Sequence, residues 1–125
     1  MSFFCPECSQ AALRITASLE LPPDSRSDEI TLQAVRCSRC GFAAAAVYQE
    51  SRRGSWDDES VDHRGFYTPP EKLKELRAAI RRCPNQRDPR CTCETHRTYG
   101  RVNANGRWMG LEILEVEDSF GMRRG

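Results

Sequence analysis

Two pairs of cysteines with the same short spacing constrain this chain more than any other feature. Cys5 and Cys8 form the first pair, and Cys37 and Cys40 form the second. Two intervening residues let both thiolates lie on one side of a tight turn, so two such turns can close a tetrahedral Zn²⁺ site. A closed all-thiolate site supplies folding free energy and leaves no coordination position for a substrate. The motif therefore predicts how the chain folds more directly than what it does.

The other three cysteines and a nearby histidine form a second candidate ligand set. These residues are Cys83, Cys91, Cys93 and His96. Thiolates with an imidazole suit Zn²⁺, so we expect two Zn²⁺ per chain. Two alternatives stay open for this set. One is a two-iron cluster, as in the CDGSH-type proteins, although their motif places C-x-C first whereas the isolated cysteine comes first here. The other is three free thiols.

The size and composition of the chain make metal ions useful to its stability. A chain of 125 residues, 38% hydrophobic and 30% charged, predicts one domain with a modest core. No apolar run approaches the length of a transmembrane helix, and the N-terminus lacks the basic and apolar stretches of a signal peptide. Seven cysteines, an odd number, argue against a disulfide framework. We therefore expect a cytoplasmic location, where thiols stay reduced, and no membrane partner.

Positive charge is concentrated in one part of the sequence. The net charge of +1 gives no global attraction to nucleic acid, but residues 69–107 carry ten basic and four acidic side chains. Seventeen of the nineteen cations are arginines, which bind phosphate and carboxylate bidentately. Lys74, Arg77 and Arg81 form a basic stripe on a predicted helix and are candidate partner-binding residues. A purely structural use of these charges stays open.

Alternating apolar residues predict three strands in the N-terminal half. Residues 13–21 alternate for nine positions, with their apolar side chains on one face of a half-buried strand. Residues 30–35 and 41–48 predict two further short strands. Four alanines in the third segment suit a helix equally well, but Phe42, Val47 and Tyr48 favour a strand.

With its cysteine turns, this half of the chain resembles the zinc-ribbon (rubredoxin-like knuckle) family. The resemblance covers residues 3–50 and is carried by Cys5-Pro6-Glu7-Cys8 and by Cys37-Ser38-Arg39-Cys40-Gly41-Phe42. It implies that Gly41 relaxes the second turn so that backbone N–H groups point at sulfur. Ser9 holds the matching position of the first turn, a departure from the pattern. Iron, as in a rubredoxin-like electron carrier, is a further option. Ribbons bind nucleic acid, bind proteins or brace a neighbouring domain.

The segment between the two cysteine-rich regions has no apolar period and predicts a connecting loop over residues 51–68. Trp56 either caps the core or serves as an exposed anchor for a partner. Several groups that could bind a hard cation or act as acid and base follow it: Asp57, Asp58, Glu59, Asp62 and His63. This loop carries the alternative that the chain is a small metal-dependent enzyme.

A helix and a hairpin are predicted in the C-terminal half. Thr68 as N-cap, Pro69 at the first helical position and Glu71 in a capping box begin a helix that ends before Pro84. Its apolar face consists of Leu73, Leu76, Ile80 and Cys83. Asn105-Gly106 predicts a hairpin turn. We expect a strand over residues 111–116 and fraying of residues 120–125.

The sequence thus predicts an α+β fold: a small antiparallel zinc-ribbon sheet, one capped helix and a metal-stapled C-terminal segment with a hairpin. The expected divisions are residues 1–50, 51–68 and 69–125, and the first and last could share one core. The favoured function is a non-catalytic zinc-binding recognition or adaptor module for a protein or nucleic-acid partner. The alternatives are the enzyme above and an accessory subunit that docks its ribbon into a larger complex. The oligomeric state is not predicted.

Overall fold

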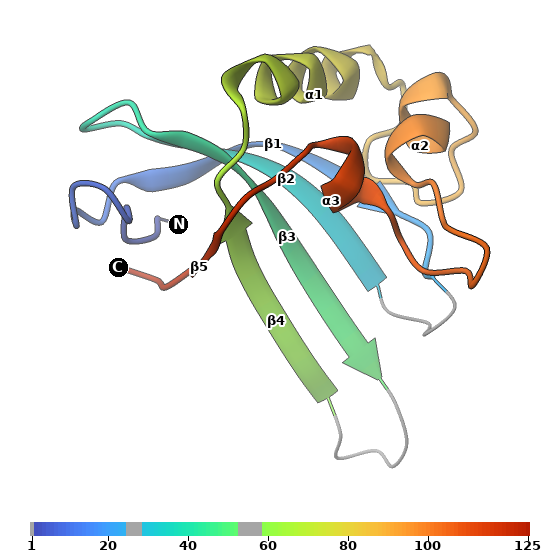
Figure 1. The fold of residues 1–125 in the computed structure, drawn as a ribbon, viewed down its shortest axis with the longest axis horizontal. Coiled ribbons are helices and arrows are strands. Elements are labelled where there is room, and N and C mark those ends of the chain that lie inside the picture. Colours follow the sequence, from blue (N-terminus) through green and yellow to red (C-terminus); the bar gives the residue numbers. More distant parts are fainter. Residues whose placement is uncertain (1, 25–28, 53–58) are drawn as a thin grey trace.

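A computed structural model describes residues 2–24, 29–52 and 59–125 and shows one antiparallel sheet with helices on one side (Figure 1). The sheet has five strands in the order β1-β2-β3-β4-β5. The strands are β1 (Leu13–Leu21), β2 (Glu29–Cys37), β3 (Ala43–Arg52), β4 (Glu59–Phe66) and β5 (Ser119–Gly121). The helices are α1 (Pro70–Arg82), α2 (Glu94–Tyr99) and α3 (Gly110–Ile113). None of the helices in the described residues is long and apolar enough to cross a bilayer.

Both faces of the central strands are covered. One face packs against α1, through contacts among residues such as Leu32, Ala45 and Leu76. The other face is covered by the chain ends, where Phe3 and Met122 contribute to a second apolar cluster. Residues 44–47 of β3 are therefore buried on both sides, and the alanines there suit a strand with cover on each face. The prediction of a strand for this segment is confirmed.

A β-bulge divides β1 between the two faces. The pairing with β2 shifts between Ile15 and Ala17, and Thr16 is the extra residue. An extra residue reverses which side chains face which way, so Leu13 joins the cluster at the chain ends and Leu19 joins the cluster under α1. The expectation of nine residues with one apolar face is therefore wrong, although the strand itself has the predicted bounds. Thr16 Oγ1 donates to the carbonyl oxygen of Ala34 at 3.1 Å.

The predicted loop over residues 51–68 contains a strand. β4 pairs with β3 along its whole length and with β5 at its C-terminal end. Its apolar cover comes from elsewhere in the chain: the Phe120 ring lies against Gly65, where an added Cβ would come within 2.2 Å of it. The pattern failed to show this strand because β4 itself supplies few apolar residues.

The predicted helix is present, but its capping box is not. α1 begins at Pro70 after Pro69 and has no side-chain cap, so the capped start is a wrong prediction. Thr68 Oγ1 instead donates to the Phe66 carbonyl oxygen (2.8 Å) and accepts from the Ala45 N–H (3.1 Å). Thr68 therefore joins the β4–α1 connection to β3.

The C-terminal segment differs from its prediction in two places. Residues 110–113 form the short helix α3 where a strand was expected over 111–116. Residues 119–121 form β5 instead of fraying, and Met122 behind them is buried. The hairpin signal is confirmed in a short form, since Val102 pairs with Trp108 around Gly106, which has a φ of 75°.

Candidate metal centres

The first cysteine group is formed by two turns with the same backbone geometry. Each turn has two hydrogen bonds at the same relative positions. They run from Ser9 N to Cys5 O (2.9 Å) and Cys5 N to Gln10 O (2.9 Å), and from Gly41 N to Cys37 O (3.1 Å) and Cys37 N to Phe42 O (2.7 Å). The residue after each second cysteine is left-handed, with φ of 63° at Ser9 and 80° at Gly41. Ser9 therefore takes the same conformation as Gly41.

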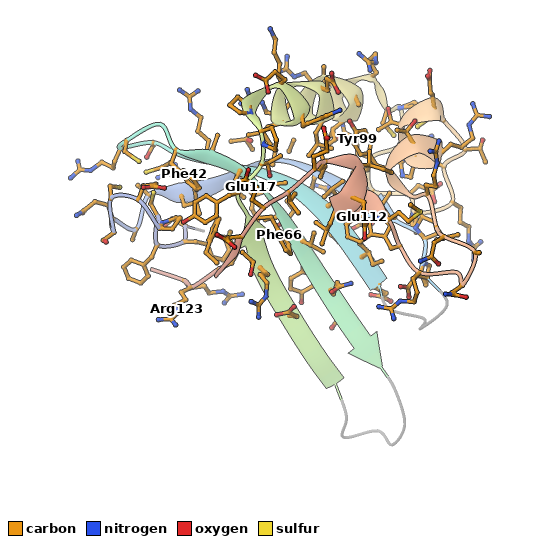
Figure 2. The ribbon with its side chains drawn as sticks, viewed as in Figure 1. Phe42, Phe66, Tyr99, Glu112, Glu117 and Arg123 are labelled. Carbon is orange, nitrogen blue, oxygen red and sulfur yellow. The ribbon has the colours of Figure 1, made fainter. Side chains whose placement is uncertain are left out.

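These turns meet at one end of the first three strands, near both chain termini (Figure 1). The first turn precedes β1, the second joins β2 to β3, and Leu13 pairs with Cys37 between them. The Sγ atoms of Cys5 and Cys40 lie 3.6 Å apart, and those of Cys8 and Cys37 lie 3.7 Å apart. All four sulfurs lie within 4.8 Å of one another. Figure 2 shows Phe42 at this end of the sheet, where its ring contacts Phe120.

The four thiols of this group do not ionise equally. A hydrogen bond from the Cys40 backbone, with help from the Arg39 backbone, lowers the pKa of Cys37 to about 6 against the effect of burial. The Phe42 backbone favours the thiolate of Cys40, but desolvation and the neighbouring thiols outweigh it and raise the pKa of Cys40 to about 12. A bound cation is the condition under which such thiols ionise together.

The second group joins the end of α1 to the start of α2. Cys83 follows the last turn of α1, and Cys93 is the N-cap of α2, where its sulfur accepts from the His96 N–H at 3.4 Å. Cys83 Sγ lies 3.9 Å from Cys91 Sγ and 3.5 Å from Cys93 Sγ. The four donor atoms of this group, with His96, also lie within 4.8 Å of one another.

A backbone contact sets the orientation of His96. Its Nε2 donates to the Glu20 carbonyl oxygen at 2.9 Å, since a carbonyl can only accept. Nε2 therefore carries the proton, and the lone pair of Nδ1 faces the sulfurs of Cys83 (3.2 Å) and Cys93 (3.3 Å). The imidazole is buried, at 4% exposure. A neutral ring held by its other nitrogen is the arrangement that metal-binding histidines use.

Ionisation is uneven in the second group as well. Burial raises the pKa of Cys83 to about 11. Burial also opposes the thiolate of Cys93, but the hydrogen bond from the His96 backbone N–H, together with the neighbouring side chains of the group, outweighs it and lowers the pKa of Cys93 to about 6. Each group thus has one thiol that ionises near neutral pH and one that needs a cation to do so.

The structure brings all eight predicted ligands into two groups that could each hold a metal ion. They lie at opposite ends of β1: the first contacts the Leu13 end through Cys37, and the second contacts Glu20 through His96. The role of Glu20 had no sequence signal, because its carbonyl belongs to the backbone. The residues that follow Cys37 and Cys93 supply the N–H groups aimed at their sulfurs.

The predicted acid–base groups do not form a site among the described residues. Trp56, Asp57 and Asp58 lie outside those residues, as does the side chain of Glu59. His63 Nε2 lies 2.7 Å from Gln33 Oε1, and its ring packs edge-on against Phe3. Asp62 lies on the opposite face of β4, where its carboxylate is 3.9 Å from Arg64 Nε. Burial lowers the pKa of His63, so this ring is neutral at pH 7.

The predicted basic stripe divides on the surface of α1. Lys74 and Arg81 are exposed, whereas Arg77 is half-buried. Arg77 and Arg81 line a hollow between α1 and the sheet, and Lys74 is not among the residues that line it.

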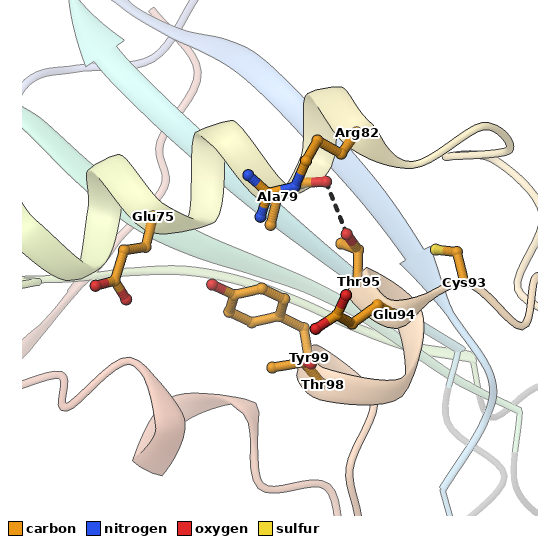
Figure 3. Close-up of a pocket in the computed structure, with 8 residues that line it drawn as sticks. All are labelled: Glu75, Ala79, Arg82, Cys93, Glu94, Thr95, Thr98 and Tyr99. Carbon is orange, nitrogen blue, oxygen red and sulfur yellow. Dashed lines mark hydrogen bonds between the residues drawn. The ribbon is translucent and has the colours of Figure 1, made fainter.

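A hollow of about 410 Å³ lies between α1 and α2 beside the second group (Figure 3). Thr95 Oγ1 donates to the Ala79 carbonyl oxygen at 2.8 Å and fixes the two helices together. Tyr99 points into this space, and burial, assisted by the charge of Glu75, raises its pKa. The tyrosine therefore stays a neutral phenol at the side of the second group.

Comparison with known proteins shows no relative. No family model, curated protein or solved structure matches this chain. The resemblance to zinc ribbons therefore depends on residues 3–50 alone, and the geometry of the two cysteine turns is compatible with ribbon-like sites.

Proposed function

We propose that this chain is a non-catalytic recognition module whose fold is held by two structural Zn²⁺ ions. The observation that carries this proposal is the pair of complete four-donor groups, one of which includes a histidine already in the metal-binding tautomer. A tetrahedral Zn²⁺ with Zn–S bonds of about 2.3 Å places its sulfurs about 3.8 Å apart. The closest pairs of sulfurs in the two groups lie 3.5–3.9 Å apart, which supports one ion in each.

The second group supports a single ion over a two-iron cluster. In such a cluster the ligands are divided between two irons, so ligands of different irons lie farther apart than ligands of one ion. Here Cys83 Sγ is within 3.9 Å of Cys91 and Cys93 sulfurs and within 3.2 Å of His96 Nδ1. One ion contacts all four donors in that space.

The closed donor sets also support a structural role over a catalytic one. Catalytic zinc keeps a position open for water, whereas each group here supplies four protein donors. The candidate acid and base, Asp62 and His63, lie on opposite faces of β4. In this proposal the module acts by binding a protein or nucleic acid. Its free thiols fit a reducing location such as the cytoplasm.

Substitution with Co²⁺ tests whether the sites are closed. We expect the protein to take up two Co²⁺ with the intense visible absorption of tetrahedral thiolate complexes, and this spectrum stays unchanged when azide is added. Cys91→Ala, which leaves one position of the second site to water, is the positive control and responds to azide. A response of the wild-type protein means an open coordination position and contradicts the proposal.

A further inference from the structure

Two adjoining hollows beside β1 are lined by arginines from distant parts of the sequence. One, of about 300 Å³, lies between the sheet and α1, and the other, of about 460 Å³, extends to the second cysteine turn. Thr16 and Arg36 line both, so the two hollows adjoin. We call them together the arginine groove, after the residues Arg14, Arg36, Arg39, Arg77 and Arg81.

The fold forces these cations together. Arg14 and Arg36 are directly paired across β1 and β2, so their side chains share a face of the sheet. Directly opposed like charges destabilise a strand pair unless another charge compensates them. Arg77 and Arg81 lie one turn apart on α1 and close the other wall.

Nothing within the described residues neutralises this charge. No acidic residue lines either hollow, and none of the five guanidinium groups belongs to an ion pair there. Arg77 Nε is buried without a hydrogen-bond partner. By contrast, Lys72 on α1 lies outside the groove and is paired with Glu115 at 3.3 Å. The groove therefore has the charge and the free donors to bind an anion from outside the chain.

The shape of the groove favours an extended anion over a small one. Five cations along two adjoining hollows match a chain of regularly spaced charges. Guanidinium groups bind phosphate oxygens bidentately and stack on bases. An acidic peptide adding to the edge of β1 is disfavoured, because Thr16 makes a bulge there and both ends of the edge are engaged, by Phe3 and by Gln86.

We propose that the arginine groove binds the phosphate backbone of single-stranded nucleic acid. A depression walled by α1 on one side admits one strand, with its phosphates along the arginines and its bases turned outward. The inference rests on the proposed function and names the partner class of that module. The two zinc groups contribute by holding β1 at each end, which keeps Arg14 and Arg36 in place beside α1.

The test is a salt titration of binding to fluorescent 20-nucleotide oligouridylate and oligothymidylate, using metal-loaded protein. Five phosphate contacts predict a slope of log affinity against log salt of about −3.5, because each contact on a single strand contributes roughly −0.7. Arg36→Gln and Arg77→Gln each weaken binding and reduce the slope by about 0.7. Lys74→Gln, a matched change of an exposed cation on α1 outside the groove, leaves both unchanged.

Each variant is also checked for zinc content and thermal stability. Removing one of two opposed arginines relieves repulsion, so Arg36→Gln melts at the same temperature as wild type or higher. A folded, zinc-loaded wild-type protein that binds no oligonucleotide at low salt overturns the groove proposal and leaves the zinc module intact. The groove proposal is also overturned if Lys74→Gln weakens binding as much as the arginine variants do. Tighter binding of duplex than of single-stranded nucleic acid, or binding of polyglutamate as tight as that of the oligonucleotides, overturns it as well. An azide-sensitive Co²⁺ spectrum overturns the underlying function instead.

Discussion

At the scale of single residues, each cysteine turn depends on one residue with a positive φ, which is Ser9 in the first turn and Gly41 in the second. Gly41 adopts its φ of 80° without a steric penalty, whereas Ser9 carries a side chain at 63°. A left-handed conformation costs an L-residue with a Cβ roughly 1–2 kcal/mol. Both residues donate the backbone bond that closes their turn, so both need this conformation.

Substitutions at these two positions are expected to change stability in opposite directions. Ser9→Gly raises the free energy of unfolding of the metal-loaded protein by about 0.5–1 kcal/mol, because strain is relieved. Gly41→Ala lowers it by about 1 kcal/mol. The methyl group at residue 41 has no neighbour within 4 Å, so a clash adds nothing. Chemical denaturation measures both, and a shift in the same direction for the two variants contradicts the turn geometry.

The thiol pKa values predict how metal affinity depends on pH. At pH 8 Cys40 and Cys83, with pKa values of about 12 and 11, hold protons that metal binding must displace. Cys37 and Cys93 have pKa values of about 6, so at pH 8 they are already thiolates. They take up protons only as the pH falls to about 6 and below. Affinity therefore falls as pH falls, and it falls more steeply below about pH 6. Competition with a chelator across pH 5–8 measures this, and a constant slope counts against the assignment.

At the scale of elements, local sequence patterns predicted α1 and the first three strands. They failed where the apolar residues that pack over a strand come from distant parts of the chain. β4 has little apolar alternation because Phe120 and Phe3 cover Gly65 and His63. The apolar residues over 111–116 fit the period of a strand and also that of a helix, and in the folded chain residues 110–113 form a short helix. The two groups of candidate ligands were predictable from the spacing of the cysteines and His96. The arginine groove was not, since it unites β1, β2 and α1 only in the folded chain.

The packing of β4 against β5 depends on the missing side chain of Gly65. Gly65→Ala puts a Cβ 2.2 Å from Phe120 Cζ, so the ring must move, and we expect a loss of about 1–3 kcal/mol of stability. Gly121→Ala is the matched control in β5, because its nearest contact is an ordinary 3.9 Å to Arg123. Thermal melts compare the two. If Phe120→Leu does not restore part of the loss at residue 65, the clash is not its cause.

At the scale of the whole molecule, two groups of side chains that could each hold a metal ion lie at opposite ends of one edge strand. The first connects the N-terminus to β2 and β3, and the second connects β1 to α1 and α2. Between them α1 packs on the sheet through a modest apolar core. Metal binding in such a chain is folding free energy. Chelation is therefore expected to reduce both the sheet signal and any binding by the groove.

Native mass spectrometry of the intact chain tests the central claim most directly. The chain is purified without added metal, and its mass is compared under native and denaturing conditions. We expect a difference of two zinc ions per chain, and of one zinc ion when two ligands of one group are replaced together, in Cys5→Ser/Cys8→Ser or in Cys91→Ser/Cys93→Ser. A wild-type chain that folds with no metal, with one zinc ion or with the mass of an iron–sulfur cluster contradicts the account.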